Sequence, residues 1–211
     1  MSNNDSAMNK IIQLLFVCGW ALCFSGNALA YDKQDLQQLL ETRECEACDL
    51  SYANLEFLNL KGVELSFANL EGAELSYACL TDANLTDAHL VSANLVNAEL
   101  KNANLSGADL EKAILTHAGF KDANLSGASL VTSYAVNADF ENARLADADF
   151  EYANLFWANF STAHLNNASL KHAYLRKARF EDTELTGTIF DGATWDDNKV
   201  CKAGSQGRCI R

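Results

Sequence analysis

The chain has 211 residues, of which 28 are acidic and 16 are basic, and its formal net charge at pH 7 is −12. This excess of negative charge repels polyanions and argues against a protein that binds nucleic acid or an anionic lipid surface. Hydrophobic residues make up 49% of the chain and proline is absent, which fits one globular domain whose backbone hydrogen bonding runs without interruption.

The N-terminal segment, 1–30, has the features of a secretion signal. Lys10 precedes an apolar run over 11–24, and a small-x-small cleavage pattern ends at Ala30. The run is too short for a membrane-spanning helix. We therefore expect cleavage after Ala30, export to the periplasm or the medium, and no membrane span afterwards. Retention as an uncleaved anchor is the alternative, and a start at Met8 would give the signal a more ordinary charged front end.

Residues 31–44 are predicted to form a short helix. The leucines that would share one face of it are Leu36, Leu39 and Leu40. Asp32 or Asp35 is available as the N-cap. We expect this helix to cover the open end of the structure that follows, because the end of a coiled sheet exposes apolar side chains and unpaired backbone groups.

An internal repeat with a period of five occupies 50–195, and such a repeat is read before any local propensity. Every fifth residue there is large and apolar, from Leu50 and Leu55 onward to Trp195, and only Ala135 breaks the size rule. A small residue, usually Ala, lies two positions before each. Five steps along an α-helix or a strand would point successive members in different directions. They can face one core only if the backbone itself coils and turns a corner at each repeat.

Phenylalanine at the repeated position indicates the size of one coil. It recurs at every fourth repeat, at Phe120, Phe140, Phe160 and Phe180. Four pentapeptides therefore make one coil. We expect the four rings to stack as a ladder inside the solenoid, because each unit of a repeat protein contacts its neighbours.

The repeats themselves resemble those of a known family. The sequence Ala-Asn-Leu-Ser-Gly occupies 103–107 and 123–127, Ala-Asp-Leu-Glu-Lys occupies 108–112, and Ala-Asn-Leu-Thr-Asp occupies 83–87. These units are similar to the repeat of the pentapeptide-repeat family, and the resemblance covers 50–195 without a slip in phase.

The resemblance implies an all-β fold, a right-handed quadrilateral parallel β-helix. With the features above, it divides the chain into a signal peptide at 1–30, an N-terminal capping helix at 31–44, the β-helix at 45–195 and a cysteine-containing tail at 196–211.

Two disulfides are expected, one at each end of the solenoid: Cys45 with Cys48, and Cys201 with Cys209. Coils spaced by about 4.8 Å separate the two ends by roughly 35 Å, whereas a disulfide needs Cα atoms within about 7 Å. A redox role for the Cys-x-x-Cys pair is not supported, because no thioredoxin-like βαβ pattern surrounds it. Cys79 remains as an outward free thiol, with an intermolecular bridge as the alternative.

One face of the predicted coil carries an aromatic cluster that is a candidate protein-binding patch. Its members are Tyr134, Val136, Phe156, Trp157 and Tyr174. Exposed apolar clusters often mark contact surfaces, so we expect a protein partner or a second copy of the chain to bind there. The alternative is that the aromatic rings only shield a flat β-face. A side chain beside the small residue Ala135 is also expected to fold inward and shrink the patch.

A neighbouring face carries an acidic row. Its carboxylates are Asp49, Glu71, Asp109, Glu111, Asp149, Glu151 and Asp191, against few cations such as Lys112 and Lys171. Such a row can imitate a phosphate backbone or collect cations, and the plainer interpretation is a solvated face.

No catalytic constellation is predicted. The histidines are His89, His117, His164 and His172, all at outward positions on different coils and faces. This register forms neither a metal cluster nor a Ser-His-Asp triad. We therefore expect no enzymatic activity, no metal and no cofactor.

The preferred interpretation is a non-enzymatic exported repeat scaffold or protein-binding module. The alternative comes from the family resemblance, because some members imitate duplex DNA and bind the topoisomerase gyrase. The acidic row is compatible with that alternative, whereas the signal segment is not, since gyrase is cytoplasmic.

Overall fold

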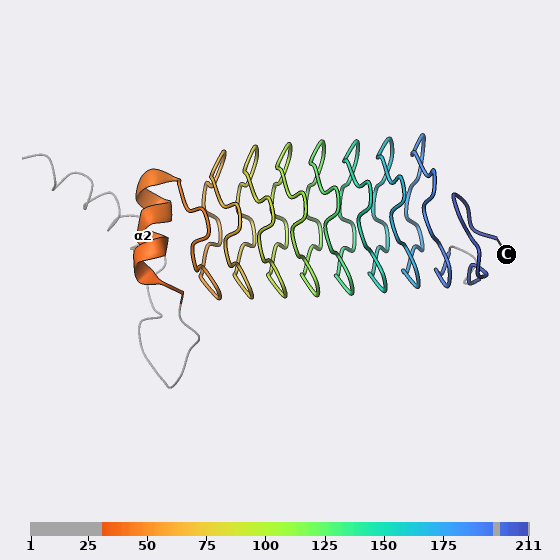
Figure 1. Cartoon of the computed structure of the whole chain (residues 1–211), viewed down its shortest axis with the longest axis horizontal. Coiled ribbons are helices and arrows are strands. Elements are labelled where there is room, and N and C mark those ends of the chain that lie inside the picture. Colours follow the sequence, from red (N-terminus) through yellow and green to blue (C-terminus); the bar gives the residue numbers. More distant parts are fainter. Residues whose placement is uncertain (1–30, 196–198, 211) are drawn as a thin grey trace, which may run out of the picture.

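The computed structural model describes residues 31–195 and 199–210, which form an elongated coil with one helix at its N-terminal end (Figure 1). The predicted signal segment, residues 1–30, lies outside the described residues. The helix is α2, Lys33–Thr42. All β-structure in the described part of the chain consists of single bridges.

Successive coils pair in parallel, and each bridge joins a residue to the one four repeats further along the chain. The first coil bridges the second at Glu44 with Glu64, and the second bridges the third at Glu64 with Asn84. Four such bridges form in each coil, one on each side, so the solenoid is four-sided. The backbone N–H of Leu85 donates to the carbonyl of Asn104 at 2.7 Å, and the N–H of Asn104 donates to the carbonyl of Ala83 at 2.9 Å. Pairing at every coil satisfies the backbone without long strands.

The core is a set of inward columns stacked along the axis. Leu50, Leu55 and Leu65 are fully buried, as is Ala53 at the small position. Each large core residue contributes about 1.5–3 kcal/mol by leaving water, and Ala leaves room for the crowded corner. The predicted phenylalanine ladder is confirmed. Its ring centroids are 5.0 Å apart between Phe120 and Phe140, 5.0 Å between Phe140 and Phe160, and 5.1 Å between Phe160 and Phe180.

Each corner is a tight turn whose second central residue has a positive φ. At the corner from Leu50 to Ala53, the N–H of Ala53 donates to the carbonyl of Leu50 at 3.0 Å, and Tyr52 has φ 58°. A positive φ at that position is the signature of a type II turn. Glycine adopts it without steric cost, yet Tyr52, Trp157 and Thr132 adopt it here as well.

Helix α2 covers the N-terminal opening of the solenoid (Figure 1). The side chain of its N-cap, Asp32, accepts hydrogen bonds from the N–H groups of Gln34 and Asp35. The helix ends where Arg43 adopts a left-handed conformation and its N–H donates to the Leu39 carbonyl. Leu39 is buried against the coil, so the helix closes the exposed end of the core.

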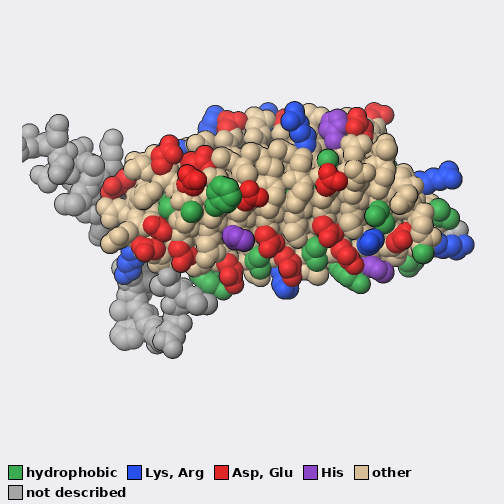
Figure 2. Space-filling model, viewed as in Figure 1, with side chains coloured by type: hydrophobic (Ala, Val, Ile, Leu, Met, Phe, Trp, Pro, Cys, Tyr) green, Lys and Arg blue, Asp and Glu red, His purple; other side chains and the backbone are tan. Residues whose placement is uncertain are grey.

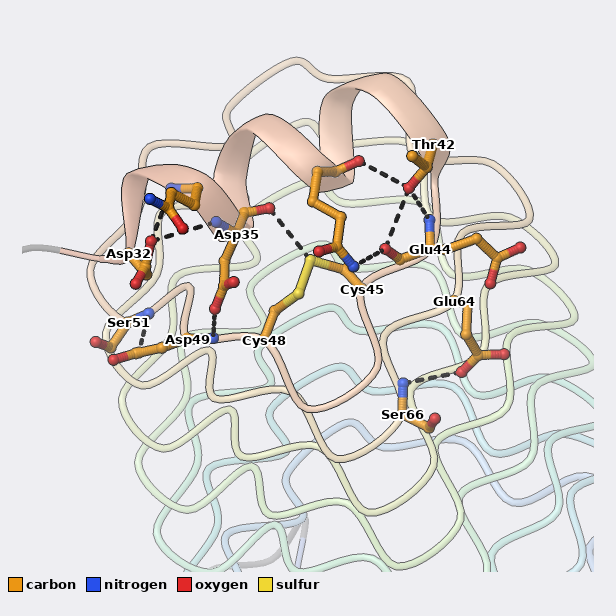
Figure 3. Close-up of a disulfide and its surroundings, with 12 residues drawn as sticks. Asp32, Asp35, Thr42, Glu44, Cys45, Cys48, Asp49, Ser51, Glu64 and Ser66 are labelled. Atoms are coloured by element: carbon orange, nitrogen blue, oxygen red, sulfur yellow. Dashed lines mark hydrogen bonds between the residues drawn. A yellow bond between two sulfur atoms is a disulfide. The ribbon is translucent and has the colours of Figure 1, made fainter.

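The first disulfide lies directly beneath α2 (Figure 3). Cys45 and Cys48 are bonded, and both are buried. The Cys45 sulfur lies 3.3 Å from the carbonyl oxygen of Asp35, and the Asp35 carboxylate accepts a hydrogen bond of 2.7 Å from the N–H of Asp49. These contacts hold the helix on the first coil.

The tail folds back over the C-terminal end. Antiparallel bridges join Ile189 to Gln206 and Thr194 to Val200. The second disulfide, Cys201–Cys209, closes the tail on itself with a Cα separation of 5.1 Å. Cys79 is a half-buried free thiol at a bridge position on an outer face. Among residues 31–195 and 199–210, no helix has the length and hydropathy to cross a bilayer.

Candidate functional site

A groove on one side of the coil brings together four of the five residues of the predicted patch. Tyr134, Val136, Phe156 and Tyr174 line it, and its volume is about 380 Å³. The lining is completed by Thr116, Asn154 and Arg176. We call this site the aromatic groove.

The coil register places these side chains side by side. Tyr134, Asn154 and Tyr174 are consecutive bridge residues on the same side of three coils. Val136 and Phe156 lie at the first turn position of the next corner, so their column runs beside the first. The rings of Phe156 and Tyr174 lie 6.2 Å apart, centroid to centroid, and are tilted by 34°. Two adjacent columns of the coil therefore bring these apolar side chains together, with the polar Asn154 between Tyr134 and Tyr174.

Trp157 lies beside the groove and not in its lining. It occupies the left-handed corner position with φ 61°. Its ring packs edge-on with that of Phe156, with the two ring centroids 6.0 Å apart. The side chain is 49% exposed. It therefore extends the apolar surface from the groove around the corner.

The expected inward folding beside Ala135 does not occur. Ala135 is fully buried, but its neighbour Tyr134 is 54% exposed. The N–H of Tyr134 donates to the Ala113 carbonyl at 2.9 Å, which fixes its backbone in the bridge and keeps the side chain outward. The small residue at 135 therefore does not reduce the groove.

Arg176 supplies the positive charge of the aromatic groove. Its Nη1 lies 3.3 Å from the hydroxyl of Tyr174. Its Nε is buried and has no hydrogen-bond partner among the described residues. A buried donor without a partner is costly, but this Nε is out of reach of solvent, so it offers no contact to an acceptor that enters the groove.

The acidic row is interrupted in space. On the side that begins with Asp49, the bridge positions of successive coils are Asp49, Asn69, His89, Asp109, Ser129, Asp149 and Ser169. The Asp109 and Asp149 side chains accept hydrogen bonds from the N–H groups of Glu111 at 3.0 Å and Glu151 at 2.9 Å. These carboxylates therefore stabilise the turns. Figure 2 shows acidic side chains scattered over the face in view, with Lys and Arg side chains projecting at the C-terminal end.

The histidines are separated from one another. His164 pairs with Glu184 at 3.0 Å, and the ring of His172 stacks on Tyr152 at 4.8 Å. His89 occupies a bridge position on the acidic side, and His117 a corner. Within residues 31–195 and 199–210, no group of three or more His, Cys, Asp or Glu side chains is arranged to hold a metal ion.

Comparison with protein families gives one match. The model described as pentapeptide repeats matches in 8 copies, over 48–87, 93–130, 123–161 and 153–192. Comparison with the curated proteins gives no match.

Several solved structures of proteins with related sequences are similar to this chain. HetL from the cyanobacterium Nostoc, a pentapeptide repeat protein involved in regulating heterocyst differentiation, is 22% identical, with a TM-score of 0.52 over 81% of this chain and 99% of HetL. A pentapeptide repeat protein from the thylakoid lumen of Arabidopsis thaliana is 26% identical, with a TM-score of 0.38 over 52% of this chain and 69% of that one. A trypsin-treated form of QnrB1, a plasmid-mediated fluoroquinolone resistance protein, is 21% identical, with a TM-score of 0.45 over 73% and 82%. The predicted fold, a right-handed quadrilateral β-helix, is confirmed.

Proposed function

Because this chain belongs to the pentapeptide-repeat family, we propose that it is an exported, non-enzymatic scaffold that binds a protein partner through the aromatic groove. The observation that carries the proposal is the convergence of Tyr134, Val136, Phe156 and Tyr174 in one groove on the coil. Aromatic side chains are enriched in the buried centres of protein interfaces, where they contribute most of the binding free energy.

The shape of the site favours a different protein over a second copy of the chain. A two-fold dimer places the same patch of each subunit against the other. Two grooves facing each other would enclose an empty space, which forfeits contact energy. A projecting loop or segment of another protein fills the groove instead.

The lining indicates what such a segment would present. The part of the lining that Val136 and Phe156 form suits an apolar side chain. The positive charge of Arg176, at one end, suits a carbonyl or carboxylate oxygen. We therefore expect a partner segment with an apolar residue next to a hydrogen-bond acceptor.

Export is supported by the cysteines. The disulfides Cys45–Cys48 and Cys201–Cys209 are typical of oxidising compartments. Intact mass of the native protein, with and without alkylation of free thiols, tests this part of the proposal. We expect a chain that begins at Tyr31, contains two disulfides and is alkylated once, at Cys79. A cytoplasmic chain with all its thiols free would contradict export and favour the alternative, an acidic DNA mimic that binds a topoisomerase.

The partner proposal is tested by site-specific photo-crosslinking in cells. A photoreactive phenylalanine analogue replaces Trp157, which borders the groove, and in a matched control it replaces Asp147. Asp147 occupies the same left-handed corner position and is also exposed, but it lies on a different edge of the coil. We expect a discrete protein adduct from position 157, reduced at least about tenfold by Phe156→Ala, since loss of a central aromatic residue costs about 2 kcal/mol or more.

Two results would contradict the partner proposal. The first is the same adduct from position 147. The second is an adduct from position 157 that Phe156→Ala leaves unchanged. An adduct with twice the mass of the chain would instead identify self-association through the groove, and would overturn the argument from shape.

A further inference from the structure

A second groove, unrelated to the aromatic one, follows an edge of the coil between two adjacent sides. Its volume is about 420 Å³, within the range of small-molecule sites. The residues that line it are Asn102, Ala103, Asn104, Asp122, Asn124, Asn142, Arg144 and His164. We call it the polar groove.

Most of the amides in the polar groove are held in place by their neighbours one coil away. Asn124 Nδ2 donates to Asn104 Oδ1 at 3.0 Å. Asn142 Nδ2 donates to Asp122 Oδ1 at 2.7 Å. These bonds fix the side chains. Asn124 Oδ1 already accepts from the N–H and the hydroxyl of Ser126, so the Asn124 amide keeps one N–H to donate, whereas Asn142 keeps one N–H and its oxygen. The groove is therefore lined by oriented polar groups.

Arg144 interrupts the column of amides. The bridge positions on this side are Asn84, Asn104 and Asn124 in three successive coils, and Arg144 comes next. The Arg144 side chain is exposed. Within the described residues, 31–195 and 199–210, its guanidinium forms no hydrogen bond and no ion pair. A guanidinium has five N–H donors arranged to match a carboxylate with two parallel bonds.

His164 is the next bridge residue after Arg144 and also lines the groove. Its Nδ1 lies 3.0 Å from Glu184 Oε2, which fixes the orientation of the ring. Its Nε2 makes no hydrogen bond with a described residue. An imidazole held at one nitrogen offers the other to a ligand in a defined direction.

We propose that the polar groove binds a small sugar acid, with its carboxylate on Arg144 and its hydroxyl groups on Asp122 and the amides of Asn124 and Asn142. The guanidinium selects the carboxylate by charge and by shape. A carboxylate such as Asp122 accepts from a hydroxyl, the Asn124 amide donates to one, and the Asn142 amide both donates and accepts. A neutral sugar would leave the Arg144 guanidinium without a ligand partner, and a simple carboxylate would make no use of Asp122 or of the remaining hydrogen-bonding capacity of the amides.

The charge of the protein restricts the ligand to one with few negative charges. The chain carries a net charge of −12, and Asp122 lies in the groove itself. A polyanion would be repelled by both. One carboxylate on a polyhydroxylated molecule satisfies the groove with the least repulsion.

The test uses D-glucuronate as the probe, with glucose and acetate as matched probes that each keep half of its chemistry. Titration of the native protein is followed by amide chemical shifts. We expect a dissociation constant on the order of 1 mM for a ligand of this size. Shifts should be confined to the amides near residues 102–164, with glucose and acetate each binding at least about tenfold more weakly. Arg144→Gln should weaken glucuronate binding about tenfold or more.

Arg179→Gln is the matched control, because it removes the same charge from an exposed arginine outside the groove. It should leave binding unchanged. Equal binding of acetate would identify a simple anion site, and equal binding of glucose a neutral-sugar site. Either result would overturn the proposal, as would no shift with glucuronate, or an Arg144→Gln effect no larger than that of Arg179→Gln.

Discussion

The rings of Phe140 and Phe160 are parallel, with centroids 5.0 Å apart and an interplanar angle of 5°, although they belong to different coils of the chain. The distance is close to the spacing of about 4.8 Å between neighbouring strands. Stacking and backbone pairing therefore favour the same register. Phe150 adds edge contacts to both rings at 5.7 Å, so this part of the core is built around Phe140.

Truncation of Phe140 should destabilise the protein strongly. Phe140→Ala removes a fully buried ring that stacks on two others, and we expect a loss of about 3–5 kcal/mol in the free energy of unfolding. Phe180→Ala is the matched comparison and should cost less, because Phe180 is only partly buried near the C-terminal end. Denaturant unfolding of both variants provides the measurement. An unchanged midpoint for Phe140→Ala would contradict the role of the ladder.

Substitution of two corner glycines, Gly62 and Gly72, distinguishes the cost of backbone strain from the cost of a side-chain clash. Gly62 has φ +65° with open space around an added Cβ, whereas at Gly72, with φ +60°, an added Cβ would meet the ring of Tyr52. Gly62→Ala should cost about 1–2 kcal/mol from the left-handed backbone alone. Gly72→Ala should cost about 0.5–1.5 kcal/mol more, because the tyrosine must leave its rotamer. Equal losses on denaturant unfolding would show that the ring adapts freely.

Gly72→Ala should also alter the titration of Tyr52. Its hydroxyl donates to Glu71 at 3.1 Å, and this hydrogen bond raises the pKa of Tyr52 above its ordinary value. Displacement of the ring in Gly72→Ala should lower the pKa of Tyr52 toward that value, while Gly62→Ala leaves it in place. Ultraviolet titration of the phenol, assigned by Tyr52→Phe, measures the difference.

Glu64 is expected to couple stability to acid. Burial by itself would raise the pKa of Glu64, but hydrogen bonds from the Asn84 side chain and from Ser66 outweigh it and lower the pKa. A carboxyl whose folded pKa is depressed stabilises the protein above its unfolded pKa, and that contribution is lost as the pH falls through the folded pKa. Asn84→Ala should therefore raise the pKa of Glu64 and reduce stability at neutral pH.

Carbon-detected titration of the Glu64 carboxyl measures this shift. Asn94→Ala is the matched control, since Asn94 makes the equivalent contacts, to Glu74 and Val96, on another side of the coil. It should leave the pKa of Glu64 unchanged. A pKa of Glu64 that did not respond to Asn84→Ala would show that the amide is not responsible.

The N-terminal disulfide should stabilise the end of the molecule and not its middle. Loss of a short disulfide loop costs about 2 kcal/mol in the chain-entropy model. In a Cys45→Ala, Cys48→Ala variant, hydrogen exchange should accelerate in α2 and the first coil, with the amides around Phe120 unaffected. Cys79→Ala should change neither region, because Cys79 forms no disulfide. Uniform acceleration along the chain would argue against a local role.

Much of the fold could be predicted because one period controls the whole repeat. The inward direction of Leu50 and Leu55 follows from the spacing, and the coil of four repeats follows from Phe120 and Phe140. The left-handed corners could not be predicted. Local preference disfavours a positive φ for Trp157, and only the pairing of adjacent coils imposes it.

The candidate sites were predicted less completely than the fold. The apolar residues of the sequence indicated Phe156 and Tyr174. Asn154 and Arg176 belong to the same two columns and line the same groove, but an apolar pattern does not point to them because they are polar. Steps of one whole coil from Tyr134 and Phe156 would have found both. Arg144 was not predicted for a different reason. Its proposed role in the polar groove depends on a guanidinium without a hydrogen-bond partner in the folded chain, and the sequence does not specify which side chains pair.

Pairing at a constant interval of four repeats also has a genetic consequence. A duplication or deletion of the DNA that encodes four consecutive repeats would add or remove one whole coil, about 4.8 Å of length, and every remaining pair would keep an equivalent neighbour. A change by a single codon would instead misalign all four sides at once. Length in this molecule is therefore free to vary in evolution in whole coils, while the two ends, each closed by its own cysteine pair, are carried along unchanged.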